Sequence, residues 1–90
     1  MRHGYYDSKP QLLNRLNRAS GQVGGIAKMI DDDQYCIDIL TQIQAVRAAL
    51  DKVALELIHD HARHCMDETD PAQKEAKTDE LTAAIARFIK

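Results

Sequence analysis

The 90-residue sequence has no tryptophan, one phenylalanine, two prolines, four glycines and two cysteines. No apolar run approaches the ~18 residues of a membrane span, and no signal-peptide segment opens the chain, so we expect a cytoplasmic protein without a membrane partner. Two cysteines without secretory context argue against a structural disulfide. There is also no glycine-rich phosphate loop, nucleophile elbow or HExxH motif, which argues against an enzyme.

Apolar residues recur at three- and four-residue steps over most of the chain, which is the helical period. The longest such pattern covers residues 35–65, where neither Pro nor Gly occurs. We expect two further helices, at residues 8–30 after a Ser8 cap and at residues 71–89 after Asp70 and Pro71. No segment shows the alternation of a strand. The sequence therefore predicts an all-α protein, one domain over residues 1–90 with three helices and a flexible tail at residues 1–7.

Two features of the first helix need an explanation. The run Asp31–Asp33 should end this helix and open the next one, where carboxylates favour the N-terminal dipole. Gly21, Gly24 and Gly25 lie inside the helix, although each glycine costs about 1 kcal/mol relative to alanine. Close packing against a neighbouring helix is the simpler explanation for these glycines, and close approach to a DNA backbone is the alternative.

The long helix carries a metal-binding pattern. His61 and Cys65 lie one turn apart on one face, where both can reach one ion. Cys36 is 25 residues before His61, which is roughly 37 Å along a straight helix. One chain therefore cannot gather the three side chains, whereas a second copy packed antiparallel and crossing near residues 49–50 would. The spacing predicts a site that exists only in a dimer.

Two thiolates and one imidazole suit Cu(I), Zn(II) or Ni(II), and three ligands without an obvious fourth favour Cu(I). The plainer interpretation is that Cys36 is a small structural hydrophobe and that the histidines are solvated. His64 competes with His61 as a ligand, and His59 should face solvent. His3, in the tail, would supply an extra nitrogen donor, most naturally to Ni(II).

Charge is distributed unevenly along the chain. The formal net charge is −2, divided into +4 over residues 1–30 and −6 over residues 31–90. This asymmetry predicts a basic face on an otherwise acidic body, and a basic face favours nucleic acid as a partner.

Several short motifs now stand out together: LNRLNR at 13–18, GQV at 21–23, YCIDILTQI at 35–43, and the pair His61 and Cys65. Over residues 8–89 they resemble the CsoR/RcnR family of bacterial metal- and thiol-responsive transcriptional repressors. The Tyr-Cys…His-x-x-x-Cys pattern is typical of the copper-sensing branch, whereas the nickel/cobalt branch tends to place His at the position of Cys65.

The resemblance implies an antiparallel four-helix-bundle dimer, built from the first two helices, and a tetramer (a dimer of dimers) formed through the third. It implies that Cys36 of one protomer binds Cu(I) together with His61 and Cys65 of the other. It also implies that Tyr35 and Glu80 surround the ligands and couple the metal to DNA release, as groups around a metal site commonly do.

For DNA, the resemblance implies phosphate contacts from Arg15, Arg18 and Lys52, which otherwise would form an ordinary solvated face. No helix-turn-helix is present, so readout would combine backbone contacts with DNA shape. The sequence departs from the family run Glu-Gly-Gln-Val-Arg-Gly by carrying Ser20 and Gly24. One acidic and one basic residue are thus missing from the expected DNA face, which bears on affinity and operator choice.

These observations lead us to expect a Cu(I)-responsive transcriptional repressor whose metal-free form binds operator DNA. When Cu(I) binds, the repressor should leave the operator, so that copper-resistance genes are expressed. Two alternatives stay open. The same scaffold could sense Ni(II) or a persulfide, or the chain could be a helical cytosolic copper-binding or storage protein. The charge of residues 1–30 argues against storage.

Overall fold

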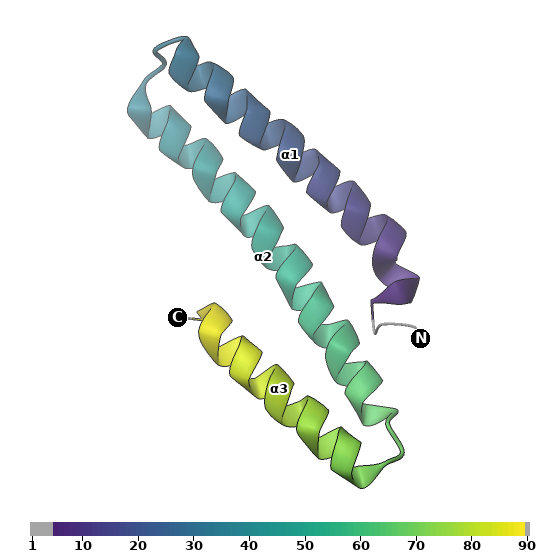
Figure 1. The fold of residues 1–90 in the computed structure, drawn as a ribbon. Helices are drawn as coiled ribbons and strands as arrows, with labels where there is room; N and C mark the ends of the chain where they lie inside the picture. The colour runs from purple at the N-terminus through teal and green to yellow at the C-terminus, as the bar shows by residue number, and fades with distance from the viewer. Residues whose placement is uncertain (1–4, 90) are drawn as a thin grey trace. The chain divides into compact units, whose positions relative to one another are not determined.

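The computed structural model describes residues 5–89, which form three long helices (Figure 1). In chain order the elements are η1 (Tyr6–Ser8, a 3-10 helix), α1 (Lys9–Asp31), α2 (Cys36–Met66) and α3 (Pro71–Ile89). No strand occurs within residues 5–89. The all-α prediction with three helices is confirmed. Each α-helix begins and ends within about one residue of its expected position, which is the precision that any assignment of helix ends allows.

The start of α1 differs from the prediction in one detail. Ser8 occupies the N-cap position and Pro10 lies in the first turn as expected, but the Ser8 side chain makes no capping hydrogen bond. Ser8 is also the last residue of η1 and has φ −93° and ψ −2°. A capping side chain normally requires extended backbone angles, so the short 3-10 helix that leads into α1 removes the cap.

The end of α1 is closed by Asp33 in the left-handed region, with φ 58°. The Asp33 N–H donates to the Ile30 carbonyl at 3.1 Å, and the Gln34 N–H donates to the Met29 carbonyl at 3.0 Å. This pair of bonds is a Schellman motif, which satisfies carbonyls that a helix end leaves unpaired. The aspartate run therefore ends α1 but does not open α2, because α2 begins at Cys36 and has only Asp38 as an acidic residue in its first turn.

α2 is a single helix of 31 residues. Val46, Val53 and Asp60 are buried at seven-residue spacing along it, so they lie on one face. Asp60 Oδ2 has no hydrogen-bond partner.

At the start of α3, Asp70 Oδ1 accepts a hydrogen bond from the Ala72 N–H at 3.1 Å, so the predicted Asp70 cap is confirmed.

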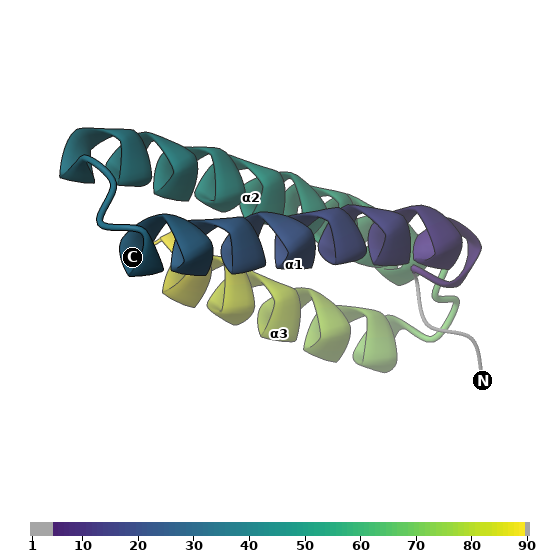
Figure 2. The same cartoon turned by 90° about the horizontal axis from the view of Figure 1, so that it is seen from above.

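The chain divides into two compact units. One contains residues 8–54, and in it α1 runs antiparallel beside the first part of α2 (Figures 1 and 2). The other contains residues 55–90 with the residues up to Asp7, and in it α3 folds back along the last turns of α2. α2 contributes to both units.

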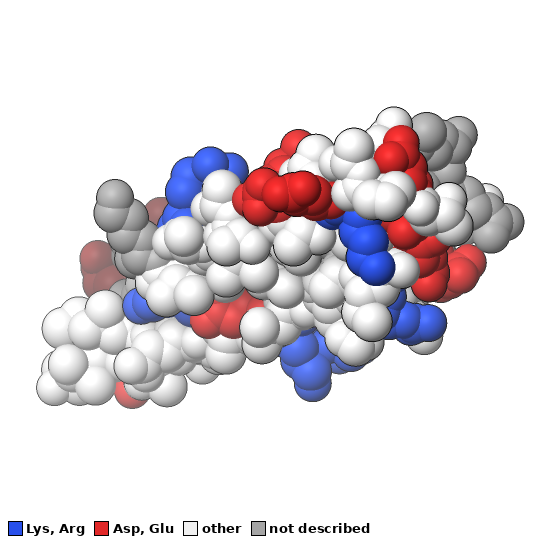
Figure 3. Space-filling model, turned by 90° about the horizontal axis from the view of Figure 1, so that it is seen from below, with Lys and Arg blue, Asp and Glu red and all other residues white. Residues whose placement is uncertain are grey.

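Few apolar side chains among residues 5–89 are buried. The buried ones in this range are Leu12, Ala19, Val46, Val53 and Cys65. In contrast, sixteen large hydrophobic side chains of the same range are exposed, among them Leu16, Val23 and Ile30 along α1. The face drawn in Figure 3 accordingly shows wide uncharged areas between its charged side chains. Apolar surface of this extent is typical of a chain that is covered by a partner.

The helical glycines do not serve close packing within the chain. A Cβ atom added to Gly21, Gly24 or Gly25 would meet no other heavy atom within 4 Å. Close packing of these glycines against a helix therefore does not occur within the single chain, and for an assembly of two or more copies it stays a prediction. Separately, no helix among residues 5–89 has the length and apolar character needed to cross a bilayer.

Candidate metal site and nucleic-acid face

The last turns of α2 carry two of the predicted metal ligands. His61 and Cys65 lie within the same helix, one turn apart, so both project from one face. Cys65 is only 4% exposed, and His61 is half-buried. An N and an S donor at this spacing can bind one ion without any change in the helix.

His61 also lines a cavity of about 310 Å³ between the end of α2 and α3. The other lining residues are Tyr5, Leu57, Ile58, Glu80, Leu81 and Ala84. The structure thus brings His61 together with Glu80, the residue expected to lie around the metal. Tyr5 was missed, because an aromatic residue in a short segment before the first helix carries no periodic signal.

Cys36 and Tyr35 lie in the other unit, at the opposite end of α2. Cys36 is exposed, and Tyr35 is 67% exposed. Tyr35 precedes the helix, and its carbonyl accepts hydrogen bonds from the Asp38 and Ile39 N–H groups at 3.1 and 3.3 Å. Neither side chain lines the cavity that contains His61.

Within residues 5–89, no group of three or more His, Cys, Asp or Glu side chains is placed to hold a metal ion. The remaining histidines differ in exposure: His59 is exposed, as expected, and His64 is half-buried. His3, considered as an extra donor, lies outside the described residues. The donor set of two thiolates and one imidazole fits a soft monovalent ion, provided that Cys36 comes from a second copy.

An ion pair that the sequence did not indicate lies next to Cys65. Lys77 Nζ donates to Glu68 Oε2 at 2.8 Å, and both side chains are partly exposed. The hydrogen bond from Lys77 holds the pKa of Glu68 below its usual value of 4.5, and the same bond raises the pKa of Lys77 above 10.5. The two residues are separated by a turn, so no helical spacing marks them as partners.

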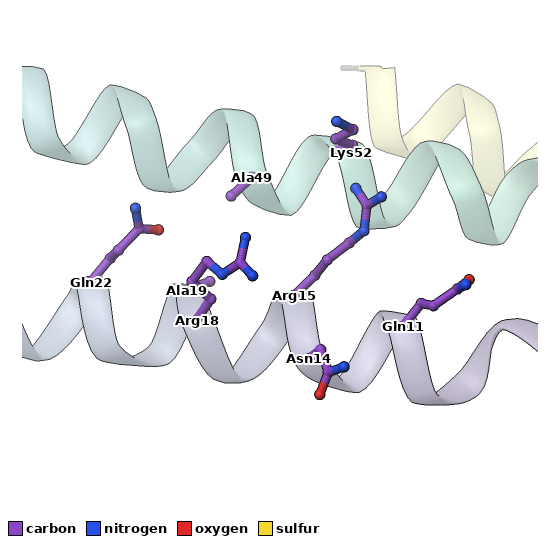
Figure 4. Close-up of a pocket in the computed structure, with 8 residues that line it drawn as sticks. All are labelled: Gln11, Asn14, Arg15, Arg18, Ala19, Gln22, Ala49 and Lys52. Carbon is purple, nitrogen blue, oxygen red and sulfur yellow. The ribbon is translucent and has the colours of Figure 1, made fainter.

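The predicted DNA contacts share one pocket. Arg15, Arg18 and Lys52 all line a pocket of about 400 Å³ within the unit of residues 8–54. In Figure 4, Arg15 and Arg18 extend from α1 toward α2, which carries Lys52. The remaining lining residues are small or neutral: Gln11, Asn14, Ala19, Gln22 and Ala49. The pocket lining therefore carries three cations and no acidic residue, which makes it suitable for an anion such as phosphate.

Comparison with known proteins identifies the family. Residues 8–87 match the model of the metal-sensitive transcriptional repressors. The chain belongs to this family. The family resemblance seen in the sequence is thus confirmed, and the protein is a transcriptional regulator rather than an enzyme.

Two relatives match almost the whole chain. The copper-sensing transcriptional repressor RicR of Mycobacterium tuberculosis is 48% identical over 92 residues, covering 98% of this chain and 95% of the relative. The copper-sensing transcriptional repressor CsoR of Bacillus subtilis is 44% identical over 91 residues, covering 100% of this chain and 90% of the relative.

Solved structures of the family share the fold. The crystal structure of the copper-sensing repressor CsoR with Cu(I) from Geobacillus thermodenitrificans superposes with a TM-score of 0.86 at 39% identity, covering 93% of this chain and 88% of that one. The nickel-responsive transcriptional regulator InrS superposes with a TM-score of 0.77 at 35% identity, covering 88% and 90%.

Proposed function

We propose that the protein is a cytoplasmic Cu(I)-responsive repressor. Its metal-free form binds operator DNA, and Cu(I) binding at a site shared between two copies releases the DNA. The ligands are Cys36 of one copy with His61 and Cys65 of the other. The observation that carries this proposal is the position of the three donors on one unbroken helix. His61 and Cys65 lie one turn apart near the end of α2, where His61 shares a cavity with Glu80, and Cys36 begins the other end.

The length of α2 supports a shared site. From Cys36 to His61 the helix contains no break, so its rise of about 1.5 Å per residue separates the two side chains by roughly 37 Å. Two copies of α2 packed antiparallel bring unlike ends together, and two-fold symmetry then produces two equivalent sites.

The exposed apolar surface supports a second copy as well. Leu16, Val23 and Ile30 are 40%, 54% and 59% exposed along α1, and a dimer that covers them removes this apolar area from water. Phe88 and Ile89 at the end of α3 are 50% and 75% exposed, which favours a further contact between dimers and hence a tetramer.

The choice of Cu(I) rests on the donors. Two thiolates and one imidazole provide a three-coordinate, sulfur-rich site, whereas Ni(II) prefers nitrogen and oxygen donors in a tetragonal arrangement. The two relatives with the highest identities given above are copper-sensing repressors. A nickel-responsive protein shares the fold at lower identity, so the metal requires a direct test.

The basic pocket supports DNA as the partner. Arg15, Arg18 and Lys52 offer charged donors to phosphate oxygens, and such contacts supply much of the affinity of a protein for DNA. Cu(I) can weaken DNA binding only to the extent that it binds the DNA-free protein more tightly than the DNA-bound protein. This difference in binding free energy is typically about 1–3 kcal/mol.

Gel retention of the DNA upstream of the protein's own gene tests this function, under anaerobic conditions and with one metal ion per protomer. We expect Cu(I) to abolish retention and Ni(II) and Zn(II) to leave it unchanged. Retention that responds only to Ni(II) would overturn the assignment of Cu(I). Cu(I) binding without DNA retention at any salt concentration would instead indicate a copper-storage protein.

A further inference from the structure

Tyr5 lies at the cavity that contains His61, although it precedes the first helix. Tyr5, His61 and Glu80 line this cavity of about 310 Å³, and the other lining residues are apolar: Leu57, Ile58, Leu81 and Ala84. Tyr5 is 39% exposed, so most of its surface is covered. A change in the orientation of the His61 imidazole therefore changes the cavity that Tyr5 lines.

The segment that carries Tyr5 leads directly into the helix of the basic pocket. η1 follows Tyr5, and α1 begins at the residue after η1. The segment up to Asp7 belongs to the unit of residues 55–90, whereas Ser8 begins the unit that contains α1. No unstructured residue separates η1 from α1. A displacement of Tyr5 is therefore passed to the start of α1, whereas a flexible linker would absorb it.

The other connection between the units is stiffer. Within residues 5–89, the chain crosses between the units at one further place, inside the unbroken α2. A long helix without Pro or Gly curves only gently, so it provides no joint at which one turn moves while its neighbour stays. The segment after Tyr5 is the shorter connection, and it joins the His61 cavity to the helix that carries Arg15 and Arg18.

Metal binding restricts what His61 can do in this cavity. A free imidazole turns about its side-chain torsions and exists as two tautomers, whereas a metal-bound imidazole keeps one orientation and one tautomer. Glu80 lines the same cavity, and carboxylates commonly accept the N–H of a metal-bound histidine. The metal-bound state of His61 therefore favours one arrangement of the cavity. If that arrangement suits one position of Tyr5 better than another, metal binding and the position of α1 are coupled.

We propose that Tyr5 is a positioning residue that transmits the metal-bound state of His61 to α1 of the same chain. This inference rests on the proposed function, because it requires His61 to bind Cu(I), and it adds a connection from the metal site to the basic pocket within one chain. Most of the cavity lining is apolar, so Tyr5 acts through the packing of its ring.

The test measures operator affinity of the full-length protein by fluorescence anisotropy, under anaerobic conditions, without metal and with one Cu(I) per protomer. The ratio of the two affinities measures the coupling. Tyr5→Ala should lower this ratio by about threefold or more, which is within the range for residues that change coupling without touching either ligand. Its operator affinity without metal should match that of the wild type.

Two matched variants accompany Tyr5→Ala. Tyr5→Phe keeps the ring and should keep the wild-type ratio. Tyr6→Ala removes the neighbouring ring, which does not line the cavity, and should also leave the ratio unchanged.

An insertion of two glycines between Asp7 and Ser8 tests the connection separately from the cavity. Tyr5 keeps its own surroundings, but the flexible insertion absorbs its displacement before α1. The ratio should therefore fall as it does in Tyr5→Ala. In the wild type, the NMR signals of the Tyr5 ring, assigned by comparison with Tyr5→Phe, should shift when Cu(I) binds.

An unchanged ratio in Tyr5→Ala or in the glycine insertion would overturn the proposal, as would an equal fall in Tyr6→Ala or Tyr5→Phe. Ring signals of Tyr5 that do not respond to Cu(I) would overturn it as well. A weaker operator affinity without metal, at an unchanged ratio, would indicate a purely structural role and contradict the proposal. Failure of the proposed function has a different signature, because the wild type itself would then keep its operator affinity when Cu(I) binds.

Discussion

A shared metal site can be tested by mixing two defective variants. Cys36→Ala keeps His61 and Cys65, and Cys65→Ala keeps Cys36. In a mixed dimer, one of the two sites receives all three ligands, and the other lacks both thiols. We therefore expect each variant alone to lose tight Cu(I) binding and the refolded mixture to recover part of it.

The size of the recovery follows from the geometry. α2 has no break between Cys36 and His61, and roughly 37 Å of helix prevents one chain from gathering the ligands. When equal amounts of the two variants pair at random, about half of the dimers contain one chain of each variant. Each of these mixed dimers has two sites, and one of the two sites has all three ligands. The mixture should thus hold about a quarter of the wild-type amount of tightly bound Cu(I).

The assay is an anaerobic titration against a chromophoric Cu(I) chelator, after the two variants have been unfolded and refolded together. Mass spectrometry of differently tagged chains verifies that mixed dimers have formed. The shared site would be refuted if the refolded mixture held no more tightly bound Cu(I) per protomer than the separate variants do. Full capacity in Cys36→Ala alone would remove Cys36 from the ligand set.

Three further predictions concern the basic pocket and two turns. Arg18→Ala should reduce the slope of log K against log salt by about 0.9 for each phosphate that the variant no longer neutralises, whereas Arg47→Ala, outside this pocket, should leave the slope unchanged. Asp33→Gly should stabilise the protein by about 0.5–1 kcal/mol in urea unfolding, because glycine adopts positive φ without a Cβ penalty. Glu68→Gln should lower the thermal midpoint near neutral pH. Since the folded pKa of Glu68 lies below 4.5, this difference from the wild type should vanish as the pH falls through that pKa, and a constant difference would contradict the role of the Lys77 bond.

The helices were predictable from the sequence because their signals are local. An apolar period without Pro or Gly defines α2, and Asp70 followed by Pro71 marks the start of α3. The error at Ser8 arose from η1, whose three residues are too short to produce a period. The role of Asp33 was also missed, because aspartate is favoured both at a helix start and, less often, in the left-handed region.

The candidate site was predictable only where a helix sets the spacing. The placement of His61 and Cys65 on one helix face follows from their four-residue separation. Arg15, Arg18 and Lys52 were named only through the family resemblance, and the structure places all three in the lining of one pocket. Pairs formed across a turn have no such rule. The bond between Glu68 and Lys77 and the position of Tyr5 depend on how the chain reverses, which the sequence pattern does not encode.

The division of the chain suggests how metal binding reaches the DNA face. The basic pocket and Cys36 belong to the unit of residues 8–54, whereas His61, Cys65 and Glu80 belong to the other. A Cu(I) ion bound by Cys36 of one copy and by His61 and Cys65 of the next therefore joins unlike units of two chains. In the proposed function, the ion would thus constrain the unit that carries the basic pocket without touching a basic side chain. If Cu(I) acts through the proposed shared site, loss of the Cys36 ligand separates the metal from the unit with the basic pocket. Cys36→Ala should therefore leave DNA binding intact and insensitive to Cu(I).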